Sequence, residues 1–158
     1  MKALVVYDSF FGNTEQVAHA IGRALGPQEE VTVLRVGDVE PQHLAGLDVL
    51  VVGSPTRAFS PTPATRKLVG GIPRGGLAGV KVAAFDTRMD IDQAPRILRA
   101  LVKVFGYAAE PLASRLKKKG GEQAVPPGGF IVEGTEGPMR DGELERAAEW
   151  AGGIIASQ

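Results

Sequence analysis

Cysteine is missing from all 158 residues of this chain. Its absence excludes disulfides, thiolate metal ligands, cysteine-bound iron–sulfur clusters and a cysteine nucleophile. Any redox chemistry must therefore come from a bound cofactor. Long apolar runs are missing too, since none approaches the ~18 residues that a membrane-spanning helix needs. A strand pattern follows directly after Met1-Lys2 and leaves no room for a signal peptide, so we expect a cytoplasmic protein with no membrane contact.

An excess of either charge is also lacking, because 18 Lys and Arg residues balance 18 Asp and Glu residues. Overall electrostatics therefore favour no nucleic-acid partner. The two histidines, His19 and His43, are isolated and lack the spacing of a Ser-His-Asp triad or a metal site. We predict no catalytic residue and no metal ligand. With 44% hydrophobic residues the chain can form one core, so residues 1–158 are predicted to be a single domain.

Continuous apolar runs predict the centre of a parallel sheet, because a strand covered on both faces does not alternate between apolar and polar residues. The segments with this pattern are 3–7, 48–53 and 80–86. The alternating, β-branched segment 30–36 predicts a strand nearer an edge. Two further pieces, 107–113 and 129–132, predict an interrupted fifth strand. The basic run Arg115 to Lys119 between them predicts a solvated loop or, as the alternative, a docking site for an acidic partner.

Apolar residues with a period of 3.6 predict helices between these strands. One helix ends at Leu25, and others run from Pro63 to about Gly70, from about Gln93 to Phe105, and from about Gly142 to Ile155. The stripe that includes Ile97, Leu98 and Leu101 is expected to lie on the sheet. The alternation of strands and helices predicts an α/β fold, a three-layer α/β/α sandwich around a five-stranded parallel sheet.

The loop Ser9-Phe10-Phe11-Gly12-Asn13-Thr14 joins the first strand to the first helix and predicts a phosphate site. The first amides of a helix have no intrahelical partner, and the helix dipole is positive at this end. Gly12 permits close approach of the backbone, while Ser9, Asn13 and Thr14 add side-chain donors. The alternative is that Asn13 or Thr14 simply caps the helix.

Two further polar loops follow the third and fourth strands, at 54–61 and 87–90. In parallel α/β sheets, ligands bind at the carboxyl edge of the strands, where all three loops are expected to meet. A Rossmann dinucleotide site is disfavoured because the first loop holds one glycine where that motif needs three, and no P-loop Gly-Lys-Ser/Thr is present. A phospho-receiver domain needs an aspartate at the end of the third strand, where this chain has Val52-Gly53-Ser54.

These features resemble the flavodoxin family over essentially the whole chain. Ser9, Gly12 and Thr14 match the family's Thr/Ser-x-Thr-Gly-x-Thr phosphate loop, and Gly53-Ser54-Pro55-Thr56 is similar to the start of its first flavin loop. The resemblance implies a flavodoxin-like fold, with the insertion in the fifth strand found in long-chain members, and FMN as the cofactor. The residues that it implies for FMN binding are Ser9, Phe10, Phe11, Gly12, Asn13, Thr14, Ser54, Pro55, Thr56, Arg57, Ala58, Phe59, Asp86, Thr87, Arg88 and Met89.

The sequence departs from this family in three respects. Phe11 stands where the phosphate loop has a threonine, the flavin loops lack the usual Trp and Tyr and contain only Phe59 as an aromatic residue, and the chain is not acidic. Because Arg57 and Arg88 would favour the anionic reduced flavin, we expect a less negative potential than in acidic flavodoxins. The alternative is that both arginines face solvent or a partner.

Three functions are consistent with the sequence. The resemblance favours an FMN-binding electron-transfer protein, a monomer or weak homodimer, which passes electrons between redox partner proteins without a substrate pocket of its own. The second is an FMN-dependent NAD(P)H or quinone oxidoreductase. The third is a flavodoxin-fold interaction module without bound flavin.

Overall fold

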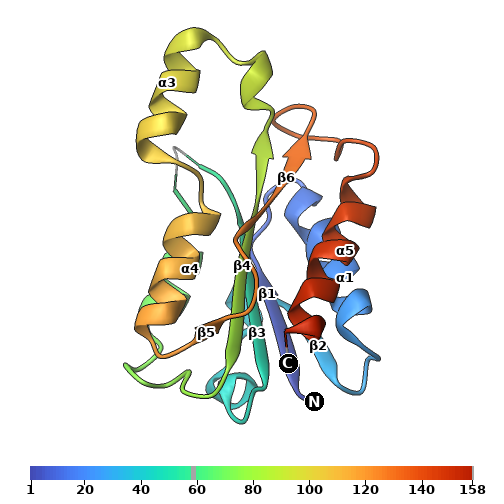
Figure 1. The fold of residues 1–158 in the computed structure, drawn as a ribbon, viewed down its shortest axis with the longest axis vertical. Helices are drawn as coiled ribbons and strands as arrows, with labels where there is room; N and C mark the ends of the chain where they lie inside the picture. The colour runs from blue at the N-terminus through green and yellow to red at the C-terminus, as the bar shows by residue number, and fades with distance from the viewer. Residues whose placement is uncertain (58–59, 158) are drawn as a thin grey trace.

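A parallel sheet between two layers of helices forms the structure, a computed structural model that describes residues 1–57 and 60–157 (Figure 1). Its strands are β1 (Ala3–Tyr7), β2 (Val31–Arg35), β3 (Val49–Pro55), β4 (Lys81–Met89), β5 (Glu122–Gln123) and β6 (Gly128–Val132). The strand order is β2-β1-β3-β4-β5, and β6 also pairs with β4. All of these pairs are parallel, which confirms the predicted α/β/α sandwich.

Helices cover both faces of the sheet because the central strands are apolar on both sides. The helices α1 (Asn13–Leu25) and α5 (Glu143–Ala156) pack on one face, over a core that includes Val5, Val51 and Phe85. The helices α2 (Pro63–Gly70) and α4 (Ala109–Lys118) pack on the other face, over a core that includes Leu4, Val52 and Leu112. Figure 1 shows α1 and α5 on the opposite side of the sheet from α4.

The fifth strand position is interrupted, as predicted, but its first piece is not where the sequence placed it. β5 pairs with Lys81 and Val82, and β6 pairs with residues 85–89 of the same strand β4. Residues 109–113 belong to α4, and the run from Arg115 to Lys118 forms its last turns. The buried positions Ala109, Leu112, Ala113 and Leu116 follow a helical period. The predicted strand over 107–113 and the loop after it were therefore wrong.

β4 is longer than predicted and continues through Met89, because β6 pairs with its outer half. Thr87, Arg88 and Met89 are consequently strand residues, and the third polar loop begins only at Asp90. After the 3₁₀ turn η3 (Ile91–Gln93), the helix α3 (Arg96–Phe105) stands beyond the end of the sheet (Figure 1).

The predicted packing of α3 on the sheet was also wrong. Its main contacts are with η3, and Ile97 is 77% exposed, Leu98 41% and Leu101 37%. Short 3₁₀ turns, η1 (Val36–Asp38) and η2 (Pro41–Leu44), join β2 to β3. None of the helices within the described residues has the length and apolar content needed to cross a membrane.

Candidate functional site

The loop after β1, the outer end of β3 and the outer end of β4 meet at the carboxyl edge of the sheet. Together they line a groove of about 260 Å³. Most residues that the sequence assigned to cofactor binding line it: Ser9, Phe10, Phe11, Asn13, Thr14, Pro55, Thr56, Arg57, Thr87, Arg88 and Met89. Segments that are far apart in the sequence therefore form one continuous surface. It lies at the edge where parallel α/β sheets bind ligands.

Other predicted residues lie outside the groove lining. Gly12 is the N-cap of α1. The hydroxyl of Ser54 is buried, accepts a hydrogen bond from the Thr62 amide and donates one to the carbonyl of Pro55. Asp86 is also fully buried, and its carboxylate is hydrogen-bonded to other groups of the protein. Ala58 and Phe59, which the sequence also assigned to this site, lie outside the described residues.

Sequence reasoning missed a fourth contribution to the groove. Val132, Gly134 and Thr135 line it from the end of β6 and the loop that follows. The signal was present, because residues 129–132 were predicted to form a strand of the same parallel sheet. The carboxyl end of that strand had to reach the same edge as the other three.

The amino end of α1 presents backbone donors to this groove. Its N-cap, Gly12, has φ 89° and provides no side-chain cap, so the interpretation that Asn13 or Thr14 caps the helix was wrong. The first-turn amides of Asn13, Thr14 and Glu15 have no hydrogen-bond acceptor within residues 1–57 and 60–157. These donors and the helix dipole favour a negatively charged group here.

Hydroxyl groups extend this donor set. The Oγ of Ser9 accepts the Gly12 amide at 3.0 Å, which leaves the hydroxyl proton of Ser9 available to a ligand. The Oγ1 atoms of Thr14 and Thr87 are 2.7 Å apart, so one of the two protons remains for a ligand. The groove lining contains two arginines and, among the residues that the structure describes, no acidic side chain. This chemistry fits a phosphate monoester such as that of FMN.

The loop from Ser9 to Thr14 is braced from the neighbouring strand. Arg35 donates a hydrogen bond to the Ser9 carbonyl at 2.7 Å and lies 3.5 Å from the Glu15 carboxylate. Tyr7 also donates to Glu15, and burial together with this carboxylate raises the pKa of Tyr7 to about 12. Tyr7 therefore remains a neutral donor to Glu15 at physiological pH.

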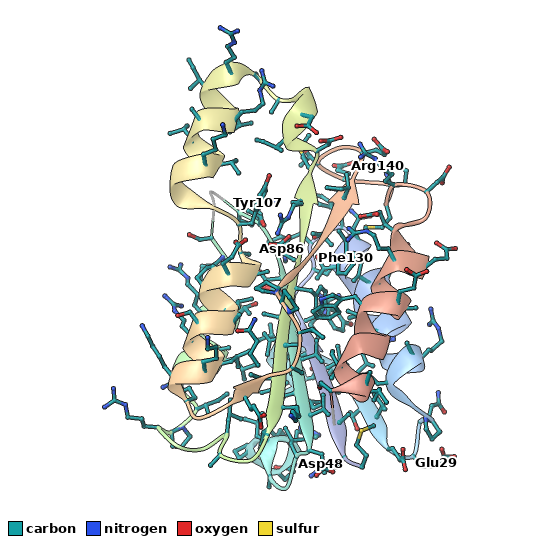
Figure 2. The ribbon with its side chains drawn as sticks, viewed as in Figure 1. Glu29, Asp48, Asp86, Tyr107, Phe130 and Arg140 are labelled. Atoms are coloured by element: carbon teal, nitrogen blue, oxygen red, sulfur yellow. The ribbon has the colours of Figure 1, made fainter. Side chains whose placement is uncertain are left out.

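The two arginines of the groove have different surroundings. Arg57 lies 4.8 Å from the centre of the Phe10 ring, is exposed, and has no acidic partner among the described residues. Arg88 binds Asp86 and stacks on Tyr107, with its guanidinium carbon 3.5 Å from the ring centre. Figure 2 shows Asp86 and Tyr107 close together between the end of β4 and α4.

Asp86 anchors this network inside the protein. It accepts two hydrogen bonds from Arg88 and one from the Ala109 amide at the start of α4. Burial raises the pKa of Asp86, and the ion pair with Arg88 opposes that rise. The network fixes the guanidinium of Arg88 at the wall of the groove rather than leaving it free in solvent.

Comparisons with known proteins agree with this geometry. The family model described as flavodoxin matches residues 5–150. A flavodoxin from the domain Archaea has a TM-score of 0.73 and 24% identity, over 99% of this chain and 97% of that one. Flavodoxin 1 from Bacillus cereus has a TM-score of 0.74 and 18% identity, over 99% and 98%. Rubredoxin oxygen:oxidoreductase from Desulfovibrio gigas has a TM-score of 0.69 and 17% identity, over 99% of this chain but 36% of that longer one. At these identities the solved structures establish a shared fold.

Proposed function

The chain belongs to the flavodoxin family, whose model covers residues 5–150, and on this premise we propose that it binds FMN and transfers electrons between partner proteins. The observation that carries the proposal is that the unpaired amides at the start of α1 and the hydroxyls of Ser9 and Thr14 lie in one groove. In this proposal the phosphate of FMN binds at that end. Thr56, Arg57 and Met89 form the other end, where the flavin ring would lie.

The surface around the groove supports a protein partner. Phe10, Phe11 and Met89 are exposed large apolar side chains at its rim. Exposed apolar groups gathered at one edge are typical of surfaces that contact another protein. When bound, the flavin supplies the redox chemistry, and the chain's own residues hold it, orient it and set the charge around it. We infer a cytoplasmic protein that acts as a monomer or weak homodimer.

Calorimetric titration with FMN and with riboflavin tests the proposal. Riboflavin lacks the phosphate, so FMN should bind at least 100-fold more tightly if the amides of α1 hold that group. Thr14→Val removes one hydroxyl and should weaken FMN binding about tenfold, with little effect on riboflavin. Ser9→Ala should act in the same direction.

Gln16→Ala is the matched control, because Gln16 is exposed on the same helix and lies outside the groove. Its affinity for both ligands should equal that of the wild type. Equal affinities for FMN and riboflavin would contradict the phosphate site. A chain that binds neither flavin would instead support the interaction module, the third function that the sequence allows.

A further inference from the structure

A second groove adjoins the first at the outer end of β4. It has a volume of about 430 Å³ and lies between α3, the end of β4 and the end of β6. Its apolar side chains include Met89, Ile91, Leu98, Val102 and Val132. The two grooves share Thr56, Arg88, Met89 and Val132. The volume falls in the range of about 300–1,000 Å³ that is typical of small-molecule sites.

The helix α3 explains why this groove exists. Because α3 stands beyond the sheet, part of its apolar face has no sheet to cover. Leu98 and Val102 line the groove, whereas Ile97, the neighbour of Leu98, does not. Leu98 is 41% exposed, so a ligand in the groove would bury apolar surface that the protein itself leaves open to water.

The charged side chains of the groove are all paired. Arg88 binds Asp86 through two hydrogen bonds. Asp90 and Glu133 both bind Arg140, at 2.8 and 2.9 Å. Figure 2 shows Arg140 near the end of β6. Asp90 and Glu133 share one arginine, so this cluster keeps a net negative charge and disfavours an anionic ligand such as a nicotinamide dinucleotide. The apolar side chains of the lining favour an uncharged ligand.

Two hydrogen-bond donors remain for a ligand. Arg88 binds Asp86 through Nε and Nη2, and its Nη1 has no acceptor within the described residues. The Oγ1 of Thr56 accepts the Ala108 amide at 3.2 Å, so its own proton is available. Both donors suit a carbonyl oxygen.

We infer that this second groove binds an uncharged, apolar ring compound with carbonyl oxygens, of the quinone class, beside the flavin site. The proposal that the groove binds such a compound depends on the groove alone. The redox role of the bound compound rests on the proposed function. A quinone bound next to reduced flavin, FMNH₂, would accept two electrons and two protons and leave as the hydroquinone, with FMN restored. The site would make the chain a quinone reductase in addition to a carrier.

Titration with 1,4-naphthoquinone tests the site on the full chain, both free of flavin and loaded with FMN. The absence of cysteine prevents addition of the quinone to a thiol. Leu98→Glu should weaken naphthoquinone binding at least tenfold, and Leu98→Gln, which adds no charge, at least threefold. Ile97→Glu is the matched control on the same helix and should change the affinity for naphthoquinone less than twofold. The FMN affinity of all three variants should stay within twofold of wild type.

A charged analogue sharpens the test. 1,4-Naphthoquinone-2-sulfonate has the same ring with a negative charge and should bind at least fivefold more weakly than naphthoquinone. Equal effects of the Leu98 and Ile97 variants, or no binding by the wild type, would overturn the site. Loss of FMN affinity in Leu98→Glu would also overturn it, because the groove would then belong to the flavin site.

The other possible occupant of the second groove is a second copy of the chain, and sedimentation velocity tests for it. A wild-type dimer that both Leu98→Glu and Ile97→Glu convert to monomer would overturn the small-molecule assignment. Naphthoquinone binding by a chain that binds no FMN would uphold the site while the proposed electron-transfer function fails. The two proposals can therefore fail separately.

Discussion

Arg88 donates two parallel hydrogen bonds to Asp86, at 2.6 and 2.7 Å, from two positions further along β4. Alternation along a strand places both side chains on the same face of the sheet. The carboxylate is fully buried, while the guanidinium reaches the wall of both grooves. The charge of Arg88 is therefore balanced inside the protein, whereas that of Arg57 is not.

Removing the carboxylate of this pair should destabilise the fold. Asp86→Ala leaves the largely buried guanidinium of Arg88 without its partner and should lower the free energy of unfolding by about 3 kcal/mol. Urea unfolding measures the change. The double variant Asp86→Asn/Arg88→Gln should recover part of the loss. Asp92→Ala, at an exposed position nearby, should have little effect, and an equal loss there would contradict the role assigned to the pair.

The two arginines should affect the flavin potential differently. Arg57→Glu should make the midpoint potential of bound FMN more negative by tens of millivolts, because it replaces an unbalanced positive charge near the groove with a negative one. Arg88→Gln should have a smaller effect, because it changes the charge by one unit instead of two. Without Arg88 to oppose it, burial also raises the pKa of Asp86 further and favours its neutral form. Spectroelectrochemistry measures both potentials. An unchanged potential in Arg57→Glu would remove Arg57 from the flavin environment.

Phe11 offers a gain-of-affinity test of the phosphate loop. Phe11→Thr restores the hydroxyl that the family's loop has at this position and should tighten FMN binding about three- to tenfold, the value of one hydrogen bond. The side chain is 47% exposed, so its replacement should cost little stability. Phe11→Ala is the control for loss of the ring, and its FMN affinity should not rise. If both variants gain equally, the hydroxyl is not responsible.

Glu143 should make stability depend on pH. Its carboxylate binds Arg146 and accepts the Ile131 amide at 2.7 Å, and these bonds, Arg146 first, hold its pKa below the usual value of 4.5. A carboxyl whose pKa falls on folding stabilises the protein above its unfolded pKa. That contribution is lost as pH falls through the lower, folded value.

Glu143→Gln should therefore reduce stability by about 1 kcal/mol at pH 7 and flatten the decline in the free energy of unfolding below pH 4.5. Urea unfolding at pH 3 to 7 provides the measurement. Glu145→Gln, on the exposed side of the same turn, serves as the control. A decline that is equally steep in Glu143→Gln and wild type would show that other carboxyls dominate.

Local patterns were enough to predict most of the fold. The apolar runs in β1, β3 and the inner half of β4, the Thr62 cap with Pro63 at the start of α2, and the glycine at the start of α1 are short-range signals. Because the loops after parallel strands share the carboxyl edge of the sheet, the order of strands and helices along the chain brings three of these loops together. The same rule applies to the loop after β6, whose strand the sequence also predicts.

By itself, the sequence determined the parallel α/β sandwich and the glycine-containing loop that starts α1, because both depend on residues that are close together in the chain. Only the tertiary structure decided the outer end of β4, since Arg88 and Met89 become strand through pairing with the distant β6. Only the tertiary structure showed that Arg88 pairs with the buried Asp86, whereas Arg57 has no acidic partner among the described residues. The apolar stripe of α3 has a helical period wherever it lies, so periodicity could not show that it lines a groove instead of covering the sheet.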